Sequence, residues 1–167
     1  FFWAEGFGFI DEEKKIKADE NTIYRVGSVS KLFTDIAIMK KSEVGGIDID
    51  LPIQNYLPKF NPKNIYNNKP ITLRQLMSHR AGILREPAYG NYFADNEPSL
   101  KKTIESINKS SLIHPPGTKT KYSNAGIAVV GYTLEKVFQK PYVEFMQENV
   151  LNPLGMNNSS FKFKNSM

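Results

Sequence analysis

A glycine and two serines lead into an apolar segment at residues 27–46, which read GSVSKLFTDIAIMKKSEVGG. Apolar side chains recur in it at close to the 3.6-residue period of an α-helix, and the paired glycines are typical of a helix end. The pattern predicts a helix over residues 28–44. Its middle is apolar almost all round, which favours burial on most sides. The side chains expected to anchor it in the core are Leu32, Phe33, Ile36 and Met39.

Ser28 and Lys31 begin this helix and are candidates for nucleophilic chemistry. At a spacing of three residues, both side chains lie on one helical face, about 5–6 Å apart at Cβ. A serine hydroxyl is a weak nucleophile until a neighbouring base takes its proton. Burial and the positive end of the helix dipole disfavour an ammonium group, so an amine there can act as that base. The alternative is that Ser28 only caps the helix.

The Ser-x-x-Lys spacing is not specific by itself, because it occurs at four places in the chain. The other three pairs begin at Ser99, Ser106 and Ser159. Only the pair at Ser28 follows a predicted extended segment, has glycine before the serine and enters an apolar helix. Context therefore favours Ser28 and Lys31 over the other pairs.

A second candidate element is Tyr122 with Asn124, at the start of a helix predicted over residues 124–138. A phenol can relay a proton, and an amide oxygen can hold an ammonium group. The alternative is an ordinary helix cap formed by Ser123 or Asn124. His79 is interpreted as structural, because no carboxylate or second histidine lies at triad or metal-ligand spacing from it.

Turn and capping signals predict the other elements. Residues 1–10 and 16–18 read as two strands of a hairpin, followed by an extended segment at 21–26. Helices are predicted from the capping box at Thr72 through Met77, from a cap at Ser99, and from Pro141 through Val150. Loops are predicted at 48–57, 61–70 and 79–96. Strands followed by helices indicate an α+β protein whose remaining strands lie beyond residue 167.

The composition is that of an ordinary folded protein of about one domain. The chain has 167 residues, of which 40% are hydrophobic and 23% charged. Its net charge of +5 comes mainly from scattered lysines, which argues against a nucleic-acid surface. No run approaches the ~18 apolar residues of a membrane span. Cysteine is absent and no ligand cluster is evident, so we expect neither a metal nor another cofactor.

Taken together, these elements resemble the serine β-lactamase-related family, which includes class C β-lactamases, D-alanyl-D-alanine carboxypeptidases and related esterases. The matching stretches are 27–31, 45–46, 48–52, 56–58, 71–79, 116–117, 122–126 and 152–156. The likeness runs from about Gly6 to Phe161. It implies a β-lactamase or penicillin-binding-protein-like fold, an antiparallel sheet flanked by helices. Residues 1–167 would form a single partial domain that lacks the C-terminal strands.

The resemblance implies a serine hydrolase that forms an acyl-enzyme on an amide, a β-lactam or an ester. Ser28 would be acylated, and its backbone N–H would form half of the oxyanion hole. Lys31 would accept the proton of Ser28 or tune the group that accepts it, and Tyr122 would be the general base and the proton shuttle to the leaving group. Asn124 would hold Lys31 and contact the substrate amide. The chain departs from the family in having Arg80 and Ala81 where His-Thr-Ser-Gly is common, and in lacking a third motif that recognises the substrate carboxylate.

The resemblance also implies the partners and the location. The partner would be a small-molecule or peptide substrate, such as a β-lactam, a D-Ala-D-Ala-type peptide or an ester. Neither a nucleic acid nor a transmembrane segment is expected. No signal peptide is visible, and we interpret the chain as part of a longer protein of the cell envelope or the secreted space.

Two alternatives stay open. The first is a binding or sensor module that recognises penicillin on the same fold without turnover. The second is a structural helical domain in which Ser28 and Asn124 are only caps.

Overall fold

The computed structural model describes residues 3–66, 69–91 and 98–162. Its strands are β1 (Phe9–Asp11) and β2 (Ile16–Lys17). Its α-helices are α1 (Ser30–Glu43), α2 (Leu73–Met77), α3 (Leu100–Asn108), α4 (Asn124–Val137) and α5 (Tyr142–Met146). Short turns of other helix types are η1 (Gly27–Val29), η2 (Ile53–Asn55) and η3 (Gln147–Leu151). The order of a strand hairpin followed by helices confirms the sequence prediction.

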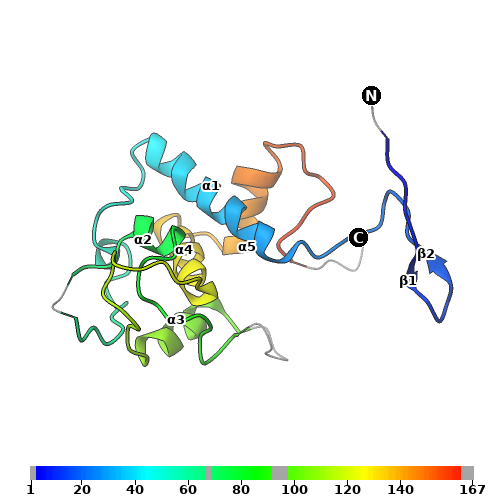
Figure 1. Ribbon diagram of the computed structural model, residues 1–167. Helices are drawn as coiled ribbons and strands as arrows, with labels where there is room; N and C mark the ends of the chain where they lie inside the picture. The colour runs from blue at the N-terminus through cyan, green and yellow to red at the C-terminus, as the bar shows by residue number, and fades with distance from the viewer. Residues whose placement is uncertain (1–2, 67–68, 92–97, 163–167) are drawn as a thin grey trace.

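β1 and β2 form an antiparallel hairpin that lies to one side of the helices (Figure 1). Phe9 pairs with Lys17 across it. The predicted hairpin is thus confirmed, but its first strand is shorter than the predicted residues 1–10. Gly8 has a φ of 77°, which interrupts extended backbone directly before β1. Residues 1–2 lie outside the described part of the chain.

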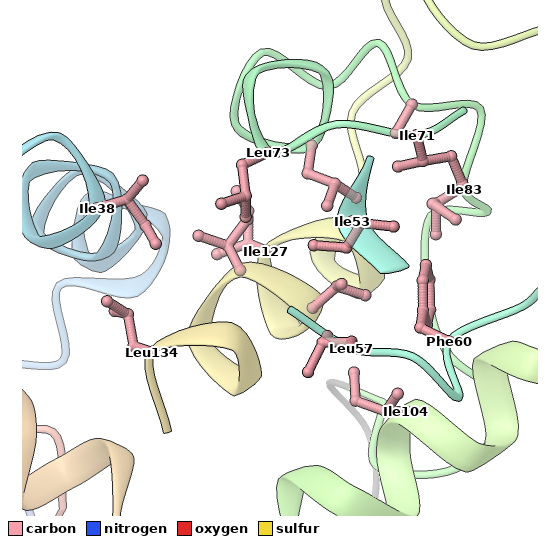
Figure 2. Packing of buried hydrophobic residues seen from close by; sticks show 14 of the residues in the cluster. Ile38, Ile53, Leu57, Phe60, Ile71, Leu73, Ile83, Ile104, Ile127 and Leu134 are labelled. Atoms are coloured by element: carbon pink, nitrogen blue, oxygen red, sulfur yellow. The ribbon is translucent and has the colours of Figure 1, made fainter. Parts of the chain in front are cut away.

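α4 is the centre of the helical packing, and α1, α2, α3 and α5 all contact it. Leu134 of α4 and Ile38 of α1 are both fully buried, and Figure 2 shows Leu134 at the end of α4 nearer to α1. The same apolar cluster continues through Leu57 and Phe60 to Ile104 of α3. Burying each such side chain contributes about 1.5–3 kcal/mol, so the cluster holds α4 firmly.

Side-chain caps define three helix starts, two of them as the sequence predicts and the third, at Ser123, as its alternative for that segment allowed. Thr72 accepts the backbone N–H of Gln75 at 3.3 Å, and the Gln75 side chain accepts the N–H of Thr72 at 3.2 Å. Ser99 caps α3 and Ser123 caps α4 by accepting a backbone N–H. Each cap satisfies an N–H that has no partner within its helix.

α1 is buried on one side only, which corrects the expectation of burial on most sides. Three of the four expected anchors are exposed, namely Leu32 (58%), Ile36 (40%) and Met39 (43%). Phe33 is half-buried and packs against the core, and Ala37 and Ile38 are buried. The main neighbours of α1 are η1, which precedes it, and α4, α5 and η3. The last three cover one flank of α1 (Figure 1). A pattern that is apolar all round therefore does not imply burial all round here.

The last predicted helix is split into two geometries. Pro141 precedes α5, which passes at Met146 into the π-type turn η3 and ends at Asn152. The predicted loop at 48–57 contains η2, and those at 61–70 and 79–96 hold no helix or strand among their described residues. Residues 67–68 and 92–97 of these loops are outside the described part. Within the residues that the structure covers, no helix has the length and apolar character needed to cross a membrane.

Asp35 on α1 is a carboxylate in unfavourable surroundings. Its Oδ1 is buried and has no hydrogen-bond partner among the described residues. Burial raises the pKa of Asp35 from 3.8 to about 6, although the charge of Lys31 acts in the opposite direction. Because the folded state binds this proton more tightly than the unfolded chain, the group favours folding at low pH. That contribution is lost as the pH rises through the window between the two values.

The Asp35→Asn variant is therefore expected to be more stable than the wild type at about pH 7.5, by about 1–2 kcal/mol. This gain in stability is smaller than the full change in the pKa of Asp35 implies, because the side chain is only half-buried and water screens its charge. Urea unfolding near pH 7.5 and near pH 4 measures both free energies, and the gain should fall at the lower pH. Glu43→Gln, an exposed carboxylate on the same helix, is the control. An equal gain for Asp35→Asn at both pH values would contradict this explanation.

Candidate active site

Ser28 lies in the turn η1 that leads into α1, not at the α-helix start that the sequence predicts. Gly27 has a φ of 54°, a value that favours glycine, and η1 begins at this residue. Neither η1 nor α1 has a side-chain cap, and Ser30 Oγ donates to the Gly27 carbonyl at 2.6 Å. The alternative that Ser28 only caps the helix is therefore wrong. Its hydroxyl is exposed to solvent.

Three of the predicted site residues meet at hydrogen-bonding distance. Ser28 Oγ lies 2.6 Å from Tyr122 Oη, which comes 94 residues later in the chain. Lys31 Nζ donates to Ser28 Oγ at 3.1 Å and lies 5.0 Å from the centre of the Tyr122 ring. Lys31 and Tyr122 are half-buried. The exposed hydroxyl thus contacts one group that can accept its proton, the Tyr122 oxygen, and one that donates a hydrogen bond to it, the Lys31 amine.

The loop that follows α2 holds the start of α4, and with it Tyr122. Ser123 Oγ donates to the carbonyl of Leu84 at 2.6 Å. The backbone N–H of Asn124 donates to the carbonyl of Arg85 at 2.8 Å. Groups at the beginning of α4 that would otherwise face water are thus bonded to this loop. Both segments are fixed relative to each other, and the position of Tyr122 follows from that.

Asn124 lines the same site, but it bonds to a residue that the sequence analysis did not single out. Its amide nitrogen donates to the carboxylate of Glu86. Among the described residues no hydrogen bond joins Asn124 to Lys31, although the resemblance implies one. Lys31 bonds instead to Ser28. Glu86 lies in a loop without periodicity, so no spacing signal in the sequence could have identified it.

The site opens into a pocket of about 1120 Å³, which is large enough for a peptide or a drug-sized molecule. Ser28, Lys31, Tyr122 and Asn124 all line it. Its wall also carries charges of both signs, from Arg25, Arg85 and Glu86. These residues were missed because single charged residues in irregular loops carry no pattern. In the described part of the chain, no group of three or more His, Asp or Glu side chains could hold a metal ion.

Known proteins match this chain in sequence and in structure. The family model described as Beta-lactamase matches residues 2–166. Beta-lactamase-like protein 4 of Dictyostelium discoideum is 36% identical over 153 residues, which cover 84% of this chain and 27% of that protein. EstCE1, described as a hydrolase with promiscuous acyltransferase activity, aligns with a TM-score of 0.85 at 29% identity, covering 95% of this chain and 45% of that one.

A further solved structure is a beta-lactamase/D-alanine carboxypeptidase from Yersinia pestis complexed with citrate. It aligns with a TM-score of 0.83 at 26% identity, covering 96% of this chain and 46% of that one. This chain therefore spans less than half the length of each of these three proteins. The likeness supports the predicted fold class, a partial β-lactamase or penicillin-binding-protein-like fold.

Burial, hydrogen bonds and nearby positive charges all act on the ionisation of Tyr122. Burial by itself would raise the pKa of Tyr122. Hydrogen bonding with Lys31 and Ser28, together with the charges of Lys31 and Arg85, outweighs burial and lowers that pKa from 10.0. The Arg85 guanidinium lies 5.3 Å from the ring centre. A lowered pKa increases the share of Tyr122 that is ionised, and the phenolate is the form that can accept a proton.

Replacing Lys31 by Met is expected to raise the pKa of Tyr122, because Met keeps an unbranched side chain but removes the cation that stabilises the phenolate. The phenolate absorbance, recorded against pH as the difference between each protein and its Tyr122→Phe variant, isolates this one tyrosine. Lys121→Met, which removes an exposed lysine next to Tyr122 in the sequence, is the control and should change the titration less. A Tyr122 titration that is the same with and without Lys31 would show that the cation does not control it.

Proposed function

Because the chain belongs to the beta-lactamase family, we propose that the protein is a serine hydrolase that forms an acyl-enzyme at Ser28. The substrate is an amide, a β-lactam or an ester. One observation carries the proposal, namely that Ser28 Oγ contacts both Tyr122 Oη and Lys31 Nζ. A hydroxyl that contacts a proton acceptor and a hydrogen-bond donor and is open to a pocket suits nucleophilic catalysis.

In the proposed first step, Ser28 Oγ attacks the carbonyl carbon of the substrate and loses its proton to Tyr122. The two oxygens are already 2.6 Å apart, so the proton needs no rearrangement of the chain. The negative charge on the carbonyl oxygen is stabilised in part by the backbone N–H of Ser28. The bond to the leaving group then breaks, and Tyr122 returns the proton to the departing nitrogen or oxygen.

In the second step, a water molecule attacks the ester formed with Ser28. Tyr122 takes a proton from this water and returns it to Ser28 Oγ as the acyl group leaves as an acid. Each proton that Tyr122 accepts it also gives back, so the enzyme is regenerated unchanged.

Lys31 is assigned the role of the cation that supports Tyr122. The 3.1 Å contact of its Nζ with Ser28 Oγ aligns the hydroxyl, and its charge helps to lower the pKa of Tyr122. Tyr122 is favoured as the base because Lys31 can then keep its proton throughout. Asn124 is assigned to the substrate amide, with its orientation fixed by the bond to Glu86. Residues 1–167 act as one partial domain in this proposal, and the expected location is the cell envelope or the secreted space.

Acylation is tested by intact mass after incubation of the protein with a fluorescent penicillin and, separately, with a reactive phosphonate. One adduct is expected on the wild type and none on Ser28→Ala. Tyr122→Phe should slow labelling by about 10²–10⁴-fold, because it removes the proton acceptor. Ser159→Ala, which alters another serine of a Ser-x-x-Lys pair, is the matched control and should be labelled like the wild type.

Labelling that persists in Ser28→Ala would overturn the assignment of the nucleophile. A penicillin adduct that forms at Ser28 but is never hydrolysed would instead favour the binding or sensor module that the sequence analysis left open. Release of the acid product with recovery of the unmodified mass supports the hydrolase.

A further inference from the structure

His79 contacts the segment that carries Tyr122 in three ways. Its carbonyl accepts the backbone N–H of Lys121 at 2.8 Å. Its ring atom Nδ1 accepts the backbone N–H of Ser123 at 3.3 Å. Its ring lies 4.6 Å from the ring of Tyr122, at an angle of 43°. One residue thus contacts Tyr122 and both of its neighbours in the chain.

The backbone of His79 is in a conformation that directs the side chain to this place. Its φ is 58°, in the left-handed region that few residues other than glycine adopt. The preceding helix α2 ends at Met77, and the N–H of His79 donates to the Leu76 carbonyl at 3.1 Å. A left-handed residue directly after a helix is common, but glycine is usual there. A histidine that tolerates this conformation is consistent with use of its side chain.

The contact with Ser123 fixes the protonation state of the imidazole. Because Nδ1 accepts a hydrogen bond, it carries no proton, and the ring is neutral with its hydrogen on Nε2. Burial, and then the charge of Lys31, lower the pKa of His79 from 6.5. The charged and titratable groups that act on it are Lys31 of α1 and Tyr122, and Arg85 lies over the ring of Tyr122 at 5.3 Å. The adjacent Arg80 donates to the carbonyl of Gly117.

We propose that His79 is a positioning residue, which holds the phenol of Tyr122 against Ser28 and Lys31 through the neutral imidazole. Its effect on acylation rests on the proposed function, whereas its effect on the position of Tyr122 does not. Protonation of His79 removes the acceptor of the Ser123 N–H and adds a cation beside Lys31. The neutral ring therefore contributes above pH ~6.5, and the contribution is lost as the pH falls through the lowered pKa.

Two substitutions separate this role from that of a helix terminator. His79→Asn keeps an acceptor for the Ser123 N–H, and asparagine tolerates positive φ. His79→Phe keeps an aromatic ring beside Tyr122 but has no acceptor. The control is Gln139→Phe, because Gln139 is an exposed residue after α4 with a φ of 50°, so that this variant reproduces only the backbone strain.

The expected results follow from the position of the phenol. His79→Phe should lower the rate of labelling by penicillin about 10²-fold, the loss that a displacement of about 1 Å can cause. His79→Asn should keep most of the wild-type labelling rate, and Gln139→Phe should be labelled at the wild-type rate. The pKa of Tyr122, followed by phenolate absorbance against the matching Tyr122→Phe double variants, should rise in His79→Phe and not in His79→Asn, because the phenol moves away from Lys31.

The proposal is overturned if His79→Phe leaves the pKa of Tyr122 unchanged. It is also overturned if His79→Asn and His79→Phe raise that pKa equally. Failure of the proposed function is a different result, because a wild type that is never labelled still gives the Tyr122 titration. The pH profile supplies a second readout in a protein that is labelled. Asp35, whose pKa burial raises to about 6, is the other group that could make the labelling rate fall on the acid side. If His79 is the cause, the fall should be smaller in His79→Asn and unchanged in Asp35→Asn. A fall that is unchanged in His79→Asn and smaller in Asp35→Asn would contradict a role for the imidazole.

Discussion

The unpaired N–H groups at the start of α4 are the constraint on which the site depends. A helix start leaves several donors without partners, and water or protein must satisfy them. Here the loop after α2 does so, through the carbonyl of Arg85 and the side chain of His79. The same bonds that complete α4 therefore bring Tyr122 to Ser28. A local requirement of one helix places two residues far apart in the chain at 2.6 Å from each other.

The burial of the helices explains why the proposed nucleophile is accessible while its partner Tyr122 is firmly held. α4 is buried on most sides and cannot shift without disturbing the core, whereas α1 is covered on one flank. Ser28 precedes α1 in the turn η1 and remains exposed. The proposed base, Tyr122, thus comes from the start of the most firmly packed helix, and the hydroxyl of Ser28 lies where a substrate could reach it. This division suits a site that must be preorganised without being closed.

Charge is distributed around the site in a way that favours the phenolate. Lys31 and Arg85 lie near the ring of Tyr122, whereas the nearby carboxylate of Glu86 is bonded to Asn124. Asp35, one turn beyond Lys31, is the exception, since burial favours its neutral form. An imidazole that stays neutral fits the same arrangement, because another cation would be costly beside Lys31. The electrostatics of the pocket therefore depend on which of these groups hold a proton.

Local signals in the sequence were enough for the hairpin, the capping box at Thr72 and the pairing of Ser28 with Lys31, because each depends on residues a few positions apart. The likeness in order and spacing also indicated the fold class and Tyr122. Only the tertiary structure decided that α1 is half-exposed, that Asn124 bonds to Glu86 and that His79 contacts Tyr122. Those features arise between segments 38 to 44 residues apart or from the packing of whole helices, and no sequence period encodes them.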